Sequence, residues 1–195
     1  MLNRSLNEGY TNYQLKLNAA FGMLVSIYVD PEYPDDFVPG FVRALNSRQV
    51  LLGAVSSYGR YDGFLAVRLS CILMVLSEDD LALRLKRIIE IDNESPPELV
   101  EVLPDEDFVH ALCRAVQERG QVITLLTSNG DYAGQVAALD DIRVTLLAFD
   151  YFGEPDETIS VRLRDVEMAS LGAEEERMLQ KLFDAWSSRK GESEL

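Results

Sequence analysis

The sequence predicts a mainly β protein with helices, of the α+β class, in which two small bent β-barrels follow one another along the chain. Three observations lead to this expectation. Residues 40–90 align with residues 134–184 without a gap, and 14 of these 51 positions are identical. Each copy holds short alternating segments rich in β-branched residues, and a helical pattern lies on either side of them. A repeat of this length is typical of two domains, because a solenoid stacks three or more shorter units.

The first copy is expected to open with a helix over 5–21. Five short strands should follow, at 23–29, 38–46, 49–56, 64–69 and 71–76. The copy closes with a helix over 78–91, which has apolar residues on one face. These are Leu81, Leu85, Ile88 and Ile89.

The second copy repeats this order. Its opening helix is expected over 104–120, with acidic residues at the start and Gly120 at the end. Its strands should lie at 121–127, 133–140, 142–150, 158–163 and 165–169. Its closing helix, over 173–186, has an apolar face made by Met178, Leu179, Leu182, Phe183 and Trp186.

The expected domain boundaries follow from this pattern. The first barrel with its helices takes residues 1–91, and the second takes 107–188. Residues 92–106 contain three prolines and several acids, which is typical of a linker, and residues 189–195 are expected to be a frayed tail. Five short strands cannot bury both faces as a flat sheet, so the economical solution is a small bent barrel with the opening helix at one end.

Charge is distributed unevenly along the chain. The net charge is −15, and residues 1–90 contribute −1 of it (nine Lys and Arg against ten Asp and Glu). Residues 91–195 contribute −14 (nine against 23). Proteins that bind nucleic acid gain much of their affinity from cations that neutralise phosphates, so the second half is a poor nucleic-acid surface. The nearly neutral first half is not excluded by this argument.

The sequence was also searched for membrane and secretion signals and for patterns of cysteines. The sequence shows no run of about 18 apolar residues that would cross a bilayer and no secretory signal pattern, so we expect a cytoplasmic protein without a membrane partner. Cys71 and Cys113 both lie in apolar patterns, as buried cysteines do. Neither a disulfide framework nor a zinc site is expected.

The strand pattern resembles that of the Sm and Sm-like (LSm) family. Its sequence motif is most similar to that of the bacterial RNA chaperone branch called Hfq. The resemblance covers about 21–76 and 119–169. It rests on a glycine that starts the second strand, followed by an apolar residue, a polar turn residue and further apolar strand residues. In the first copy these are Gly40, Val42, Asn46, Val50 and Leu52, and in the second Gly134, Val136, Asp140, Val144 and Leu146. The resemblance implies an opening helix, a five-stranded barrel and assembly through edge strands, although other small barrels share this pattern.

The residues with which Sm proteins hold RNA do not carry over. The family typically has an Asp and an Asn after the second strand and a basic or histidine-bearing connection between the last two strands. In this chain the residues after the second strand are Asn-Ser-Arg-Gln over 46–49 in the first copy and Asp-Asp-Ile-Arg over 140–143 in the second. The late connections read Leu-Ser-Cys over 69–71 and Leu-Arg-Asp over 163–165. The closing helices, which the shortest family members lack, could instead cover the barrel edges.

Candidate interaction residues cluster around one turn of the first copy. They are Tyr58, Arg60, Tyr61 and Phe64. Aromatic residues and arginine on an exposed hairpin are typical of protein interfaces and of base stacking, but the same residues could simply cover the barrel rim.

Arg68 and Arg162 are candidate contacts as well, because they recur at equivalent places beside Asp62 and Asp156. The favoured interpretation is that each arginine pins its own hairpin turn. The alternative is a contact to an anion or to a carboxylate of a partner.

The sequence indicates no catalytic, cofactor or metal site. His110 is the only histidine and has no nucleophile or acid at catalytic spacing nearby. The acidic clusters mostly mark expected helix starts, where carboxylates cap free amides.

Three functions remain open from the sequence. The first is a non-enzymatic assembly or protein-interaction module, which would use the first hairpin and exposed strand edges with a protein partner or with a second copy. The second is single-stranded RNA binding by the first barrel, through Arg43, Arg48, Arg60 and Tyr61. The third and weakest is an enzyme that holds an anionic substrate with Arg68 or Arg162.

Overall fold

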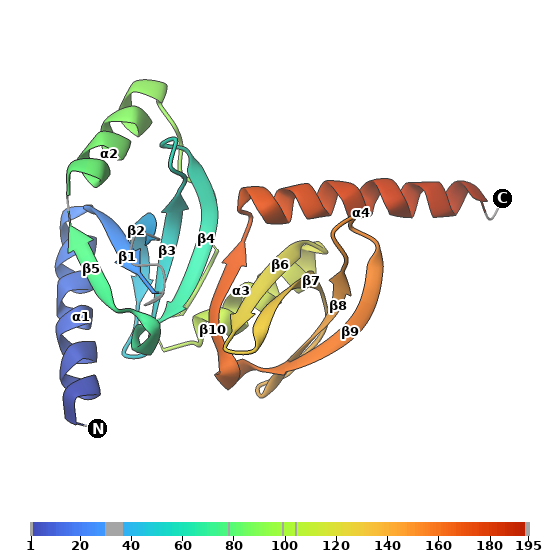
Figure 1. The fold of residues 1–195 in the computed structure, drawn as a ribbon, viewed down its shortest axis with the longest axis horizontal. Coiled ribbons are helices and arrows are strands. Elements are labelled where there is room, and N and C mark those ends of the chain that lie inside the picture. Colours follow the sequence, from blue (N-terminus) through green and yellow to red (C-terminus); the bar gives the residue numbers. More distant parts are fainter. Residues whose placement is uncertain (1, 30–36, 78, 99, 104, 194–195) are drawn as a thin grey trace. The chain divides into compact units, whose positions relative to one another are not determined.

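The computed structural model describes residues 2–29, 37–77, 79–98, 100–103 and 105–193. The chain divides into two compact units, Met1–Phe108 and Val109–Leu195 (Figure 1). The segment expected to be a linker, 92–106, therefore lies within the first unit. The described residues form four α-helices and ten strands, so the α+β class is confirmed.

The first unit is an antiparallel sheet with helices before and after it. It contains α1 (Leu2–Phe21), β1 (Leu24–Tyr28), β2 (Phe37–Leu45), β3 (Gln49–Val55), β4 (Tyr61–Arg68), the 3₁₀ turn η1 (Leu69–Cys71), β5 (Met74–Ser77) and α2 (Asp80–Asp92). The strand order is β5-β1-β2-β3-β4. The strand expected at 64–69 begins earlier, at Tyr61, and the one expected at 71–76 is preceded by η1.

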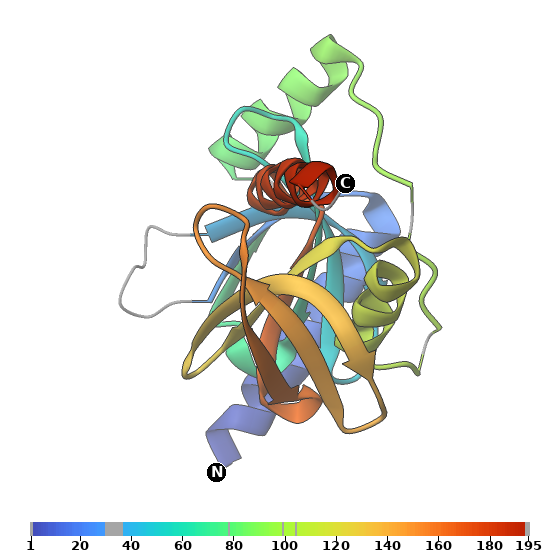
Figure 2. The same ribbon diagram turned by 90° about the vertical axis from the view of Figure 1, so that its right-hand side faces the viewer.

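The second unit has the same elements in the same order. It contains α3 (Phe108–Arg119, whose first residue belongs to the first unit), β6 (Val122–Thr127), β7 (Gly130–Leu139), β8 (Arg143–Phe149), β9 (Pro155–Arg162), η2 (Leu163–Asp165), β10 (Val166–Leu171) and α4 (Glu174–Ser193). The order is β10-β6-β7-β8-β9, and the strands curve strongly (Figure 2). Residues 189–193, expected to be frayed, continue α4, and 194–195 lie outside the described residues.

Neither unit shows a closed sheet. The strand order is linear in both, and β5 and β9 each pair with one described neighbour of their own unit, β1 and β8. Closure into two Sm-like barrels is therefore not confirmed.

Equivalent irregularities bend the strands of both units. A bulge separates Val42 from Ala44 in β2, and another separates Val136 from Ala138 in β7. A second pair of register shifts lies near the ends of β3 and β8. Because a bulge adds one unpaired residue and increases local twist, these positions curve the sheets around their cores.

The core of the first unit is built around β3, whose seven residues are all buried. One part of it joins the sheet to α2 through Leu24, Val55, Ala82, Leu85 and Ile89. The start of α2 is fixed by Asp79, whose side chain accepts a hydrogen bond from the Ala82 amide (2.7 Å). Asn93, in the left-handed conformation (φ 50°), ends the helix.

Candidate interaction site

The β3–β4 hairpin, where sequence reasoning places its main candidates, rests on α2. The Ser56 amide donates to the Arg60 carbonyl (2.8 Å), and the Gly59 amide donates to the Ser56 carbonyl (3.0 Å). Gly59 has φ +75°, and a Cβ there would lie 2.6 Å from the Ile88 Cγ2 atom of α2. The glycine therefore lets the turn contact the helix directly.

The hairpin candidates divide into exposed and buried side chains. Tyr58 is 78% exposed, and Arg60 is also exposed. Tyr61 is half-buried, because its ring lies beside that of Phe41 with centroids 6.1 Å apart. Phe64 is only 4% exposed, so its place in the expected surface is corrected: β4 starts at Tyr61 and carries Phe64 into the core.

Arg68 and Arg162 lie at the far ends of β4 and β9, away from the hairpin turns. The Arg162 Nε atom donates to the Asp165 carboxylate (2.5 Å), three residues along the chain. The expected pinning partner, Asp156, is not the residue in this ion pair. Tyr58 and Arg68 stand at opposite ends of β4, so the candidates of the first unit are spread along this strand. Arg162 belongs to the second unit.

The four residues named for RNA binding are also separated. Arg48 lies in the β2–β3 turn and Arg60 in the β3–β4 hairpin, so the seven residues of β3 stand between them. At a rise of roughly 3.3 Å per residue, that strand is about 20 Å long. Arg43 crosses Gly53 and Tyr61 pairs with Val55, so both lie toward the hairpin end of β3, where Arg60 also lies.

The β2–β3 turn binds a distant part of its own unit. The Asn46 side-chain amide donates to the Glu106 carbonyl (2.9 Å). Gln49, fully buried, accepts from the Phe108 amide with its Oε1 atom (2.7 Å) and donates to the Asp107 carboxylate with its Nε2 atom (3.1 Å). The β2–β3 turn thus holds residues 106–108.

The equivalent turn of the second unit uses a carboxylate in the place of Asn46. The Oδ1 atom of Asp140 accepts hydrogen bonds from the amides of Ile142 (2.7 Å) and Arg143 (2.8 Å). These backbone hydrogen bonds stabilise the ionised form and lower the pKa of Asp140. In the first unit the neutral Oδ1 of Asn46 accepts from the amides of Arg48 and Gln49.

Arg43 forms a cluster that sequence reasoning did not find as a unit. Its guanidinium carbon lies 5.8 Å from the ring centroids of both Phe41 and Tyr61. It crosses Gly53, where a Cβ would lie 2.8 Å from the Arg43 Nε atom. A glycine inside a strand can mark close approach by another group, and this was the available signal.

The edge strands β5 and β9 differ in chemistry. Around β5, three apolar side chains are exposed: Leu73 by 48%, Met74 by 44% and Leu76 by 36%. On β9, Asp156 and Glu157 are exposed instead. A strand with one neighbour leaves backbone donors and acceptors available for a further strand.

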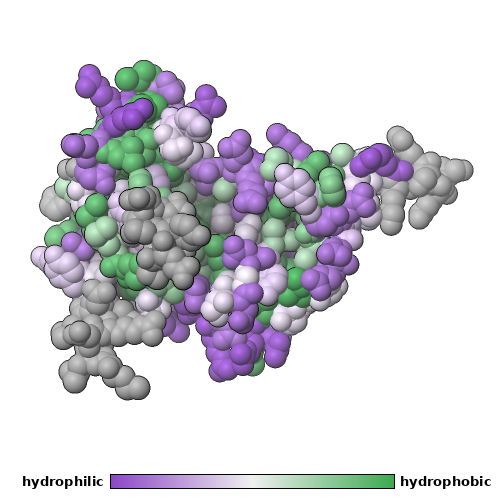
Figure 3. Space-filling view, in the orientation of Figure 1, coloured by the Kyte–Doolittle hydropathy of each residue, from purple (hydrophilic) through white to green (hydrophobic). Residues whose placement is uncertain are grey.

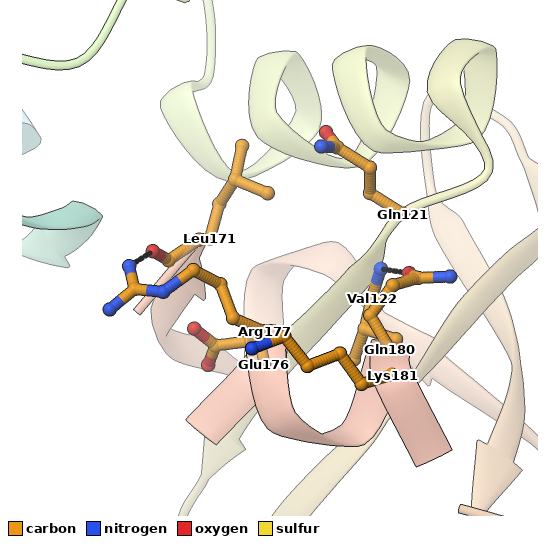
Figure 4. A pocket seen from close by; sticks show the side chains of 8 residues that line it. Gln121, Val122, Leu171, Glu176, Arg177, Gln180 and Lys181 are labelled. Carbon is orange, nitrogen blue, oxygen red and sulfur yellow. Dashed lines mark hydrogen bonds between the residues drawn. The ribbon is translucent and has the colours of Figure 1, made fainter. Parts of the chain in front are cut away.

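A pocket of about 240 Å³ lies in the second unit beside the first turns of α4 (Figure 4). Two of its polar side chains, Arg177 and Gln180, are engaged within the protein. The Oε1 atom of Gln180 accepts from the Val122 amide (2.9 Å), and the Arg177 guanidinium donates to the Gly172 carbonyl.

Glu176, which also lines this pocket, is 4% exposed and accepts three hydrogen bonds. The donors are the Thr124 hydroxyl (2.7 Å), the Ser170 hydroxyl (3.2 Å) and the Ala173 amide (2.7 Å). Both oxygens of this carboxylate therefore have donors within the second unit. Its role is to join α4 to β6 and β10.

The part of the chain that the structure describes holds no group of three or more His, Cys, Asp or Glu residues that could bind a metal. His110 is half-buried and has an interaction within the protein. Among the described helices, none has both the length and the apolar character that a membrane span requires. No family model, curated protein or solved structure matches the chain.

Proposed function

We propose that this chain is a non-enzymatic assembly module, built from two Sm-like units of a tandem duplication, that associates with further copies by adding strands at its edges. The observation that carries the proposal is the pair of edge strands, β5 with exposed apolar side chains and β9 with exposed carboxylates. Backbone hydrogen bonds give affinity in strand addition, and side chains on the two faces give specificity.

The repeated architecture supports this proposal. Both units share strand order, bulge positions and 3₁₀ turns. The separation of Arg48 from Arg60 and the use of the β2–β3 turn for residues 106–108 favour protein association over RNA binding. A phosphate backbone is best held by several cations along one path.

Light scattering over a range of concentrations tests the proposal. We expect particles larger than the 21.9 kDa chain, and we expect the double variant Met74→Lys, Leu76→Lys to reduce the mass toward that of one chain. Lysines on an edge strand oppose pairing through charge and desolvation. Leu83→Lys is the matched control, because Leu83 is 48% exposed but lies on α2.

Two outcomes would contradict the assembly proposal. One is a mass of a single chain at every concentration. The other is an increase in mass that requires short RNAs and is reversed by salt, which would support the RNA-binding alternative.

A further inference from the structure

The Arg43 guanidinium in the first unit lies between two aromatic rings, and no anionic side chain among the described residues contacts it. It lies 5.8 Å from the ring centroids of Phe41 and Tyr61, whose own centroids are 6.1 Å apart. Attraction between a cation and the face of an aromatic ring fixes the position of a guanidinium. Arg43 is half-buried, so part of its side chain remains accessible.

Local backbone features place this side chain. The register of β2 with β3 shifts between Val42 and Ala44, so Arg43 is the extra residue of a bulge. The Nε atom of Arg43 would lie 2.8 Å from a Cβ at Gly53, so the missing side chain of that glycine provides the space. The bulge and the glycine together position the guanidinium over β3.

The second unit lacks all four residues of this cluster. The positions equivalent to Phe41, Arg43, Gly53 and Tyr61 are Gln135, Ala137, Leu147 and Pro155. Gln135 instead donates to the Gly120 carbonyl (2.6 Å). The cluster is therefore not a requirement of the shared architecture, which the second unit forms without it.

The donors of Arg43 are unused within the described part of the chain. No oxygen there accepts a hydrogen bond or forms an ion pair with its guanidinium. An arginine has five N–H donors in a planar fork, and that fork matches the two oxygens of a carboxylate. Because the two rings already restrict the side chain, binding an anion costs little additional conformational entropy.

We infer that the Arg43 cluster, defined as Phe41, Arg43, Gly53 and Tyr61, binds a carboxylate in an acidic segment of a partner protein. A single fixed guanidinium suits one bidentate carboxylate. An RNA backbone would need several cations along one path, but Arg48 lies at the opposite end of β3 from the cluster, and Arg60, which precedes Tyr61, adds a single charge. Residues 1–90 carry a net charge of −1, but residues 91–108 add seven acids, so the first unit carries −8 and affinity for an acidic segment must come from the Arg43 guanidinium itself.

This site is separate from β5 and β9, the strands to which the assembly proposal assigns association. In the order β5-β1-β2-β3-β4, the cluster belongs to β2, β3 and β4, and β1 stands between it and β5. Carboxylate binding and assembly can therefore succeed or fail independently.

Fluorescence anisotropy with a labelled, end-capped peptide of alternating Glu and Thr, about ten residues long, tests the inference. We expect Arg43→Ala to weaken binding about tenfold or more, as loss of a charge-assisted bidentate contact does. Arg43→Lys should also bind more weakly, because lysine lacks the planar fork. Gly53→Ala keeps the arginine and the net charge but moves the guanidinium, so it should weaken binding as well.

Arg48→Ala is the matched control, because it removes an equal charge from an exposed position of the same unit and should change binding less than about twofold. Thermal unfolding verifies that each variant is folded. The inference is overturned if Arg43→Ala and Arg43→Lys both bind like the parent, or if a peptide with Gln for every Glu binds equally well. It is also overturned if Arg43 governs binding of short RNAs but not of the acidic peptide.

Discussion

Ser26 and Thr124 occupy equivalent positions in β1 and β6, but only one of them has a partner. The Thr124 hydroxyl donates to Glu176 (2.7 Å), whereas the fully buried Ser26 hydroxyl has no partner among the described residues. The residue equivalent to Glu176 in α2 is Ala82, which offers no acceptor. The same strand position therefore stabilises one unit and carries a desolvation cost in the other.

Exchanging these hydroxyls for apolar groups should consequently have opposite effects. Ser26→Ala removes an unsatisfied buried group, and we expect stability to be unchanged or to rise by about 1 kcal/mol. Thr124→Val leaves Glu176 with one donor fewer, and we expect a loss of about 1–2 kcal/mol. Urea unfolding of the two variants measures both values, and destabilisation by Ser26→Ala of the same size as by Thr124→Val would contradict this account.

Single residues were the scale at which the sequence was least informative. Exposure at Tyr58 and Arg60 follows from their place in a turn, and both are exposed. The burial of Phe64 could not be read from the turn pattern, because it depends on where β4 begins. The Arg43 cluster depends on three strands meeting, and no local pattern encodes that.

At the scale of elements, a glycine in each hairpin turn allows the turn to pack against the closing helix of its unit. Gly59 and Gly153 have φ +75°, and a Cβ at Gly153 would lie 2.5 Å from the Leu182 Cβ atom of α4. Tyr151 (85% exposed) and Phe152 (70%) stand at the tip of the second hairpin. In each unit the hairpin turn thus contacts the closing helix, while the aromatic residues at its tip remain exposed.

Gly59→Ala should destabilise the first unit by about 2 kcal/mol or more, because left-handed strain and a clash with Ile88 add together. Gly22→Ala is the control: Gly22 has φ +62°, but nothing lies within 4 Å of its Cβ position. That variant should lose about 1 kcal/mol from strain alone. Chemical denaturation distinguishes the two, and equal losses would show that the contact with α2 contributes nothing.

Most elements could be predicted because the periodicity of apolar residues reports which face is buried. The expected segments coincide with β1 to β3 and with β6 to β8 to within a few residues. The strands β4 and β9 begin about three residues early, since hairpin pairing extends them into polar turn residues. The turns η1 and η2 were missed, because Leu69 and Leu163 continue the apolar pattern of the preceding strands.

At the scale of the whole molecule, residues 106–108 are hydrogen-bonded to the β2–β3 turn of the first unit. Gln49 reaches across 59 positions of sequence to the Phe108 amide, and Asn46 reaches across 60 to the Glu106 carbonyl. Prolines and acids predicted a linker, but they do not reveal that a buried glutamine elsewhere in the sequence binds its end.

On the face shown in Figure 3, hydrophobic and hydrophilic residues are intermixed.

Gln49→Ala should release this segment. The buried Phe108 amide would lose its acceptor, at a cost of about 1–3 kcal/mol. Hydrogen exchange should show faster exchange at Phe108, and a Glu-specific protease should cleave near Glu106 more readily. Arg48→Ala, at the exposed neighbouring position, should leave both rates unchanged. Identical behaviour of the two variants would mean that Gln49 does not hold the segment.

The exposed apolar side chains on β5 have a consequence for the colloidal behaviour of the protein. At neutral pH, molecules with a net charge of −15 repel one another over distances near the Debye length. This repulsion limits indiscriminate contact between apolar strands, so that association requires a well-matched surface. Near the isoelectric point of about 4.4, or in concentrated salt, that barrier disappears and β5 becomes a template for precipitation. The negative charge of the chain thus opposes the aggregation that the exposed apolar side chains of an edge strand would otherwise favour.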